Sequence, residues 1–239
     1  SVSTSMSNNT AVGYQALNIC QSSGNTALGK DAGKVLGTGG ESTLIGYLAG
    51  DAITTANYNT ALGHQASGQV TTGDSNTSIG NNSGSSLTTG SNNASLGYNA
   101  NPSAVGATNE VTLGNTAISA IRCQVQTISS LSDARDKENV EELPLGIEFI
   151  NTLRPVKFDW AMRDGFQKGV QEIGFVAQEL DKAQQDANAE EYMRLVLKTN
   201  PDRLESTYGK LVPILTKAVQ ELSAEVEELK KKAHNKCEE

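Results

Sequence analysis

Aromatic residues are scarce in this chain and unevenly placed. The 239 residues include one Trp and four Phe, and all five follow residue 148. Before Ser132 the chain is mainly Gly, Asn, Ser and Thr with sparse charge, whereas most Asp, Glu, Lys and Arg residues follow it. An N-terminal part of this composition cannot fill one large core, so repetition or partner chains must stabilise it. The composition therefore predicts two regions that meet at Ser132.

Cysteine and histidine are also few. Cys20, Cys123 and Cys237 are far apart and odd in number, which argues against a disulfide framework or a four-ligand zinc site. Only His64 and His234 offer imidazole ligands. We therefore expect neither a metal site nor a cofactor.

The chain lacks both an excess of basic charge and a long apolar run. Its net charge of −8 leaves no basic face for nucleic acid. No run of about 18 apolar residues is present, so no membrane span is expected. The first residues show no secretory signal, and the missing initiator Met suggests a fragment of a longer chain.

A short phrase of the type Asn-Thr-Ala-aliphatic-Gly recurs through residues 9–117. Its glycines are spaced by 16 residues once and by 17 residues five times, which is typical of stacked coils. The pattern predicts a short strand per coil with one inward aliphatic, followed by a Gly that permits a bend or a close backbone approach. The predicted inward residues are Val12, Leu28, Ile45, Leu62, Ile79, Leu96 and Leu113.

One aliphatic residue per coil is too little for a single-chain core. Three chains sharing one axis would pool these residues, so we predict a homotrimeric parallel β-helix or β-roll for the shaft, residues 1–117. A disordered linker would not keep such a register. The repeats resemble those of viral tail-fibre shafts and of trimeric autotransporter adhesin heads. Tyr14, Tyr47, Tyr58, Tyr98 and His64 are candidates for a carbohydrate-binding surface or are ordinary surface residues.

A neck, residues 118–131, follows the repeats. Ile118, Ile121, Val125 and Ile128 predict an extended, partly buried segment there. A mixed α/β globule is expected over residues 132–204. Its pattern predicts a helix over 143–153 with Pro144 in the first turn, a hairpin of strands 156–160 and 173–177, a helix from 178, and a strand or short helix over 192–198.

The last region, residues 205–239, has the pattern of a long helix that begins near Gly209 or Lys210, with Pro213 in its first turn. Its Glu and Lys residues, Glu221 among them, are expected to cover the outside. The apolar stripe favours a three-stranded helical bundle over packing on its own domain, with one phase shift near residue 218. The stripe consists of Tyr208, Leu211, Leu215, Ala218, Val219, Leu222, Val226, Leu229 and Ala233.

Four motifs in the second region occur in a characteristic order. They are Ser132-Asp133-x-Arg135-x-Lys137-x-Asn139, Leu153-Arg154-Pro155-Val156-x-Phe158-x-Trp160, Gly174-Phe175-Val176-Ala177-Gln178-Glu179, and the segment 211–222 that contains Lys217-Ala218-Val219-Gln220-Glu221-Leu222. Residues 132 to about 230 thereby resemble the C-terminal intramolecular chaperone of phage tail spikes and fibres, the peptidase S74 family.

This resemblance implies a function for the whole chain. The family's domain trimerises the chain, helps the upstream fibre to fold and then cuts itself off, as a single-turnover serine endopeptidase. It implies that Ser132 is the nucleophile, Lys137 its general base, and Ser132–Asp133 the scissile bond. The expected location is a virion tail fibre that binds a host glycan or receptor, with the chaperone part released in the host cytoplasm during assembly.

The chemistry requires more than these two residues. A serine needs a base, and Lys137 can act as one only if burial or a nearby cation lowers its pKa. Asp133, Asp136 and Glu138 would keep the lysine charged, whereas Arg135 acts in the opposite sense. We therefore expect cleavage only where a trimer interface buries Lys137. Asn139 and backbone N–H groups are candidate oxyanion donors.

The position of the cut stays open. Attack of Ser132 Oγ on its own carbonyl would form a four-membered ring, whereas attack on the Leu131 carbonyl forms a five-membered ring and cuts before Ser132. A Ser132 of a neighbouring chain or an activated water could serve the Ser132–Asp133 bond. Without the resemblance, Ser132–Asp133 is a simple turn or helix cap.

Two other functions fit parts of this pattern. A non-cleaving trimeric adhesin or structural stalk would need no protease. A membrane-released transcription factor precursor has a similar chaperone domain, but the Gly/Asn repeats and the lack of a basic face argue against it. The mass of the purified chain, whole or split, separates the first of these from the cleaving fibre.

Overall fold

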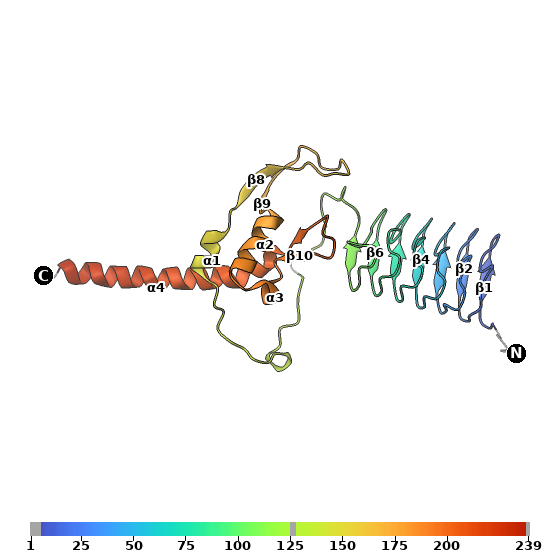
Figure 1. The fold of residues 1–239 in the computed structure, drawn as a ribbon, viewed down its shortest axis with the longest axis horizontal. Coiled ribbons are helices and arrows are strands. Elements are labelled where there is room, and N and C mark those ends of the chain that lie inside the picture. The colour runs from blue at the N-terminus through green and yellow to red at the C-terminus, as the bar shows by residue number, and fades with distance from the viewer. Residues whose placement is uncertain (1–5, 125–127, 238–239) are drawn as a thin grey trace. The chain divides into compact units, whose positions relative to one another are not determined.

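In a computed structural model, the structure describes residues 6–124 and 128–237. The chain divides into two compact units, with the boundary between Ala120 and Ile121. The first unit is a parallel β-solenoid. The second is a mixed α/β region that ends in a long helix (Figure 1).

The solenoid contains seven strands of three residues, paired in sequence order as one parallel sheet. Each residue pairs with its equivalent in the next coil, as Val12 does with Leu28 and Leu28 with Ile45. This register follows the glycine spacing and confirms the predicted parallel solenoid. The strands are β1 (Thr10–Val12), β2 (Thr26–Leu28), β3 (Thr43–Ile45), β4 (Thr60–Leu62), β5 (Thr77–Ile79), β6 (Ala94–Leu96) and β7 (Val111–Leu113).

The strand side chains face the opposite way from the prediction. The middle residue of each strand points inward, and Ala27, Leu44 and Ala61 are fully buried. The aliphatic before each Gly points outward, and Leu62 is 44% exposed. Alternation defines two faces but does not say which is inside; here the smaller residues occupy the interior. We call the exposed set the outer row: Val12, Leu28, Ile45, Leu62, Ile79, Leu96 and Leu113.

The solenoid core comes from residues outside the strands, which the sequence reading missed. A column spaced by 17 residues, Leu36, Ile53, Val70 and Leu87, is almost completely buried. Alanines that include Ala32, Ala49 and Ala66 fill the space beside it. A single chain therefore closes its own apolar core, and the argument that one chain has too little core is wrong.

Two further columns hold successive coils together. The buried Asn76 donates its backbone N–H to Asn59 Oδ1 at 2.9 Å, and Asn93 does the same to Asn76 Oδ1 at 3.0 Å, so these buried amides are paired. The repeat glycines allow the backbones to approach closely, as predicted. A Cβ on Gly46, which has φ +136°, would lie 2.3 Å from the carbonyl oxygen of Gly63.

The segment between the units is solvent-exposed. Ile118, Ile121 and Ile128 are exposed, so the predicted partial burial of the neck is wrong for the single chain. Val125 lies outside the described residues. The one regular element described between β7 and α1 is a 3₁₀ turn, η1 (Ala134–Asp136).

The globule follows the predicted order of elements with shifted boundaries. The first helix begins at Ile147, so Pro144 precedes it, and the second hairpin strand ends at Gly174. The stretch 192–198 contains both a helix end and a strand. The elements are α1 (Ile147–Thr152), the antiparallel pair β8 (Val156–Asp159) and β9 (Gln171–Gly174), α2 (Ala177–Asp186), α3 (Glu190–Met193), the antiparallel pair β10 (Val196–Leu197) and β11 (Glu205–Ser206), η2 (Tyr208–Lys210) and α4 (Leu211–Cys237).

The long helix α4 has two apolar faces rather than one stripe with a phase shift. Leu211, Ile214 and Ala218 are buried on the globule. The second face is exposed and repeats in alternating steps of three and four residues. The prediction included neither Ile214 nor Val212. We call the exposed face the seam row: Val212, Leu215, Val219, Leu222, Val226 and Leu229.

Candidate functional site

The structure brings Ser132 and Lys137 together. Lys137 Nζ donates to Ser132 Oγ at 2.7 Å. The turn η1 between them shortens the chain path, and Asp133 caps this turn by accepting the Arg135 backbone N–H at 2.9 Å. The Ser132–Asp133 pair is thus also the simple cap that the sequence allowed. A hydroxyl and an amine in contact can exchange a proton once the lysine is neutral.

Arg135 is paired with a carboxylate. Its guanidinium contacts Asp133 through Nε at 3.0 Å and Nη2 at 2.6 Å. The side-chain hydrogen bond to Arg135 lowers the pKa of Asp133, and the same bond raises the pKa of Arg135. The two charges therefore offset each other, which weakens the predicted effect of Arg135 on Lys137.

The predicted oxyanion donor Asn139 stands apart from the pair. Within the described part of the chain, Asn139 makes no hydrogen bond to Ser132 or Lys137. Its φ of 51° marks a turn of the backbone just after Lys137. Any contribution to an oxyanion hole would require a rearrangement of this segment.

The whole segment around the pair is solvated in the single chain. Residues 128–142 are all exposed. Water stabilises a charged lysine, and a charged lysine cannot act as a base. The geometry of the pair is in place, whereas the desolvation that would activate it is not.

The remaining motif residues hold the globule together. Arg154 binds Glu179 with two hydrogen bonds, one of them 3.1 Å long from Nε, and this contact lowers the pKa of Glu179. Tyr208 Oη accepts the backbone N–H of Phe175 at 3.1 Å, and their rings meet edge to face. A Cβ on Gly174 would lie 2.9 Å from that hydroxyl, so the small residue makes room for Tyr208.

Helix α4 contacts the segment that follows the pair. Glu221 Oε2 accepts the backbone N–H of Ile147 at 2.7 Å, so Glu221 caps α1 rather than covering the outside as predicted. One turn earlier, Lys217 Nζ lies 3.4 Å from Glu142 Oε2. Because these partners lie 74 and 75 residues apart, the sequence contains no local signal for either contact.

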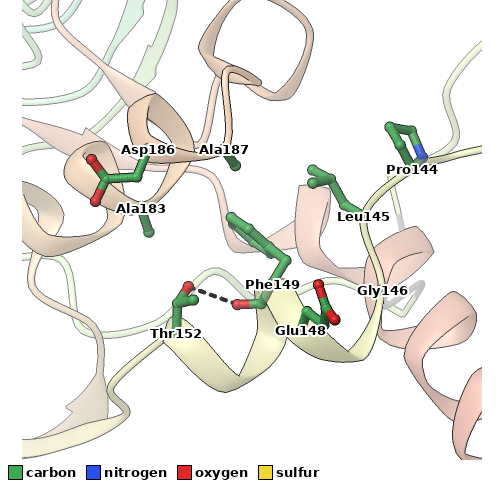
Figure 2. Close-up of a pocket in the computed structure, with 9 residues that line it drawn as sticks. All are labelled: Pro144, Leu145, Gly146, Glu148, Phe149, Thr152, Ala183, Asp186 and Ala187. Atoms are coloured by element: carbon green, nitrogen blue, oxygen red, sulfur yellow. Dashed lines mark hydrogen bonds between the residues drawn. The ribbon is translucent and has the colours of Figure 1, made fainter.

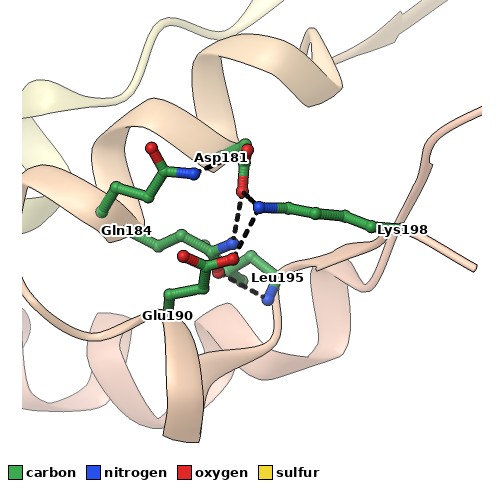
Figure 3. Close-up of polar contacts among 6 residues, drawn as sticks. Asp181, Gln184, Glu190, Leu195 and Lys198 are labelled. Carbon is green, nitrogen blue, oxygen red and sulfur yellow. Dashed lines mark hydrogen bonds and ion pairs between the residues drawn. The ribbon is translucent and has the colours of Figure 1, made fainter. Parts of the chain in front are cut away.

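A polar network that sequence reasoning missed fixes α2, α3 and β10 (Figure 3). Lys198 Nζ binds Asp181 Oδ1 at 2.7 Å and also pairs with Glu190, and these partners raise its pKa. The fully buried Gln184 accepts the Leu195 N–H at 2.9 Å and donates to Asp181 at 2.8 Å. The network is structural and lies away from Ser132 in the fold of the globule.

A cavity of about 290 Å³ lies between the start of α1 and the end of α2. Figure 2 shows Phe149 pointing from α1 toward the end of α2. Neither Ser132 nor Lys137 lines this cavity. Its lining residues are Pro144, Leu145, Gly146, Glu148, Phe149, Thr152, Ala183, Asp186 and Ala187.

The aromatic candidates on the solenoid form a surface ladder. Tyr47 stacks on His64 with ring centroids 5.4 Å apart, and Lys30 Nζ lies 5.2 Å from the centre of the Tyr47 ring. Tyr14 and Tyr98 are exposed. In residues 6–124 and 128–237, no group of three or more His, Cys, Asp or Glu side chains is placed to hold a metal ion, and no helix there is long and apolar enough to cross a membrane.

Comparison with known families locates one match. Residues 132–189 match the family model Peptidase S74, described as chaperone of endosialidase. The match begins at Ser132 and includes the Ser132–Lys137 pair, the hairpin and α2. No curated protein and no solved structure matches the chain.

Proposed function

We propose that the chain is a piece of a viral tail fibre or spike whose C-terminal region, from Ser132 onward, is an intramolecular chaperone that cuts itself off. The family match supports the chaperone role. The contact of 2.7 Å between Lys137 Nζ and Ser132 Oγ, at the first residue of that match, is the observation that carries the cleavage.

The proposed reaction is an acyl transfer to Ser132. Neutral Lys137 takes the hydroxyl proton while Oγ bonds to a carbonyl carbon; the C–N bond then breaks, and the proton passes to the leaving amine. Water hydrolyses the resulting ester. Attack on the Leu131 carbonyl releases a new N-terminus at Ser132. A cut between Ser132 and Asp133 requires a hydroxyl from another chain or an activated water.

Assembly would switch this reaction on. The pair is exposed in the single chain, and burial in an oligomer would lower the pKa of Lys137 toward neutrality. Cleavage would then report that assembly is complete. A site that is active without assembly would sever the chaperone too early.

Two exposed apolar rows support a homotrimer. The outer row runs along the solenoid and the seam row along α4, and each would be covered by copies of itself. The seam row places Val where heptads have their a position and Leu at d, a pattern that favours two-stranded coils. The number three must therefore be specified by the solenoid and the globule rather than by α4 alone.

The proposed chaperone solves a problem of register. Every coil of the solenoid repeats the last, so three chains could pair one coil out of step. A globule that holds the three ends together would set the register before the slow, long-range pairing begins. Its removal afterwards would leave a shaft that unfolds slowly and does not readily reverse.

The test compares Ser132→Ala with Ser130→Ala, an exposed neighbouring serine. The parent chain and Ser130→Ala should give two species in place of one of 25.2 kDa on denaturing mass analysis. Ser132→Ala should give the whole chain while it still assembles. A Ser132→Ala chain that splits like the parent would exclude the proposed role of Ser132.

The closed core of the solenoid favours one alternative, a non-cleaving stalk, because such a shaft needs no helper to complete its interior. A parent chain that stays whole as a trimer would support it. In the cleaving fibre, we place residues 1–131 in the virion and the rest in the host cytoplasm after release. The ladder of Tyr47 and His64 is then the candidate surface for a host glycan.

A further inference from the structure

The exposed segment that carries Ser132 and Lys137 is anchored at its C-terminal end by α4. Residues 128–142 are all exposed, and the first buried residues after them are Leu145 and Gly146. Glu221 binds the next residue, Ile147, through its backbone N–H at 2.7 Å. The freedom of the exposed segment therefore depends on how firmly this point is held.

The contact between Glu221 and α1 is closely fitted. Within the described chain, the N-terminus of α1 has no side-chain cap from its own N-cap residue, Gly146, so the Glu221 carboxylate supplies one. Unpaired N–H groups at a helix start favour a carboxylate. A Cβ on Gly146 would lie 2.0 Å from Glu221 Oε2, so any larger residue would displace the carboxylate.

The neighbouring contact is weaker. Glu142 is almost fully exposed and lies 3.4 Å from Lys217 Nζ, so water and salt screen this pair. Glu221 is half-buried. We therefore assign the anchoring mainly to Glu221.

Glu221 also lies where α4 leaves the globule. The last buried residue of α4 is Ala218, and all described side chains from Leu222 to Asn235 are exposed. A helix end without packing frays. Pairing of the seam row would stiffen this part of α4, and the carboxylate of Glu221 with it.

We propose that Glu221 is a positioning residue for the self-cleavage, through which pairing of α4 holds the segment of Ser132 and Lys137 in place. This inference rests on the proposed function. Loss of the anchor would extend the mobile segment from residue 145 to about the end of α1, which roughly doubles the length beyond Lys137. The effective concentration of a tethered group falls as about the −3/2 power of tether length, so cleavage should slow about three-fold or more.

The experiment follows cleavage during refolding of the full chain from urea, with trimer content measured in the same samples. Glu221→Ala should assemble like the parent and be cleaved at least about three-fold more slowly. Glu221→Gln keeps an acceptor oxygen and should recover part of the rate. Glu225→Ala, an exposed glutamate on the next turn, is the matched control and should behave like the parent.

A double-mutant cycle separates this role from general destabilisation. Gly146→Ala should slow cleavage in the parent but have little further effect in Glu221→Ala, because both changes remove the same contact. It also serves where Glu221→Ala fails to assemble. In uncleaved Ser132→Ala trimers, Glu221→Ala should speed hydrogen exchange of the Ile147 amide.

Two results would overturn the inference. Parent-like cleavage by Glu221→Ala, with Ser132→Ala uncut, would remove the role of Glu221 and leave the proposed function intact. Additive effects in the cycle would show that Gly146 and Glu221 act separately. A parent chain that is never cut would refute both the proposed function and this inference.

Discussion

Replacement of Leu62 on the outer row tests whether this row is an interface between chains. Leu62 is 44% exposed in the single chain, whereas its neighbour Ala61 is fully buried. Full burial of a Leu side chain is worth about 1.5–3 kcal/mol, so covering the exposed part contributes about 1 kcal/mol per chain. Three copies in a trimer contribute about 3 kcal/mol, which corresponds to about 100-fold in the association constant.

Leu62→Ser should therefore weaken trimer formation about 100-fold without unfolding the solenoid. Sedimentation equilibrium of uncleaved Ser132→Ala chains measures the association, and circular dichroism checks the fold. Val105→Ser is the matched control, since Val105 is equally apolar, 61% exposed and outside the row. Equal loss of association in both variants, or loss of the solenoid signal in Leu62→Ser, would refute the assignment of the outer row.

Four further predictions concern single side chains. Lys137→Ala should give uncut trimers, seen as one band on a denaturing gel; a split chain would remove its role as base. Gly46→Ala should lower the solenoid's stability by at least about 1–3 kcal/mol in thermal unfolding, because its φ of +136° and the Gly63 carbonyl oppose a Cβ. Burial raises the pKa of Asp51 above 3.8, so the stability that its proton contributes at acidic pH is lost as pH rises through the folded-state pKa; Asp51→Asn should raise the melting temperature at about pH 7 and change it little at about pH 3. Gln184→Leu should cost about 1–3 kcal/mol in urea unfolding because the Leu195 N–H loses its buried partner.

The sequence predicts the parts of this fold that depend on local repetition. The glycine spacing alone sets the coil length and the register, as the pairing of Val12 with Leu28 shows. The direction of the strands could not be predicted, because in a three-residue strand the two faces differ only in size of side chain. The missed column of Leu36 and Ile53 lies in turns, where the sequence has no periodic neighbours to mark it.

The globule shows the same division between local and distant information. The order of helices and strands follows from apolar spacing, and the contact of Ser132 with Lys137 joins residues only five positions apart. The role of Glu221 depends on a partner 74 residues away and on the space left by Gly146. In α4, two apolar faces overlap in sequence, which is why Ala218 and Val219 look like a phase shift in one stripe.

The order of assembly and cutting is the central claim, and a concentration series during refolding tests it most directly. At each dilution, native mass analysis follows trimer formation while a denaturing gel follows the two fragments. We predict that trimers precede fragments, that trimers are cut at a rate independent of concentration, and that chains too dilute to associate remain whole. Fragments that form equally fast from single chains at every dilution would contradict the account.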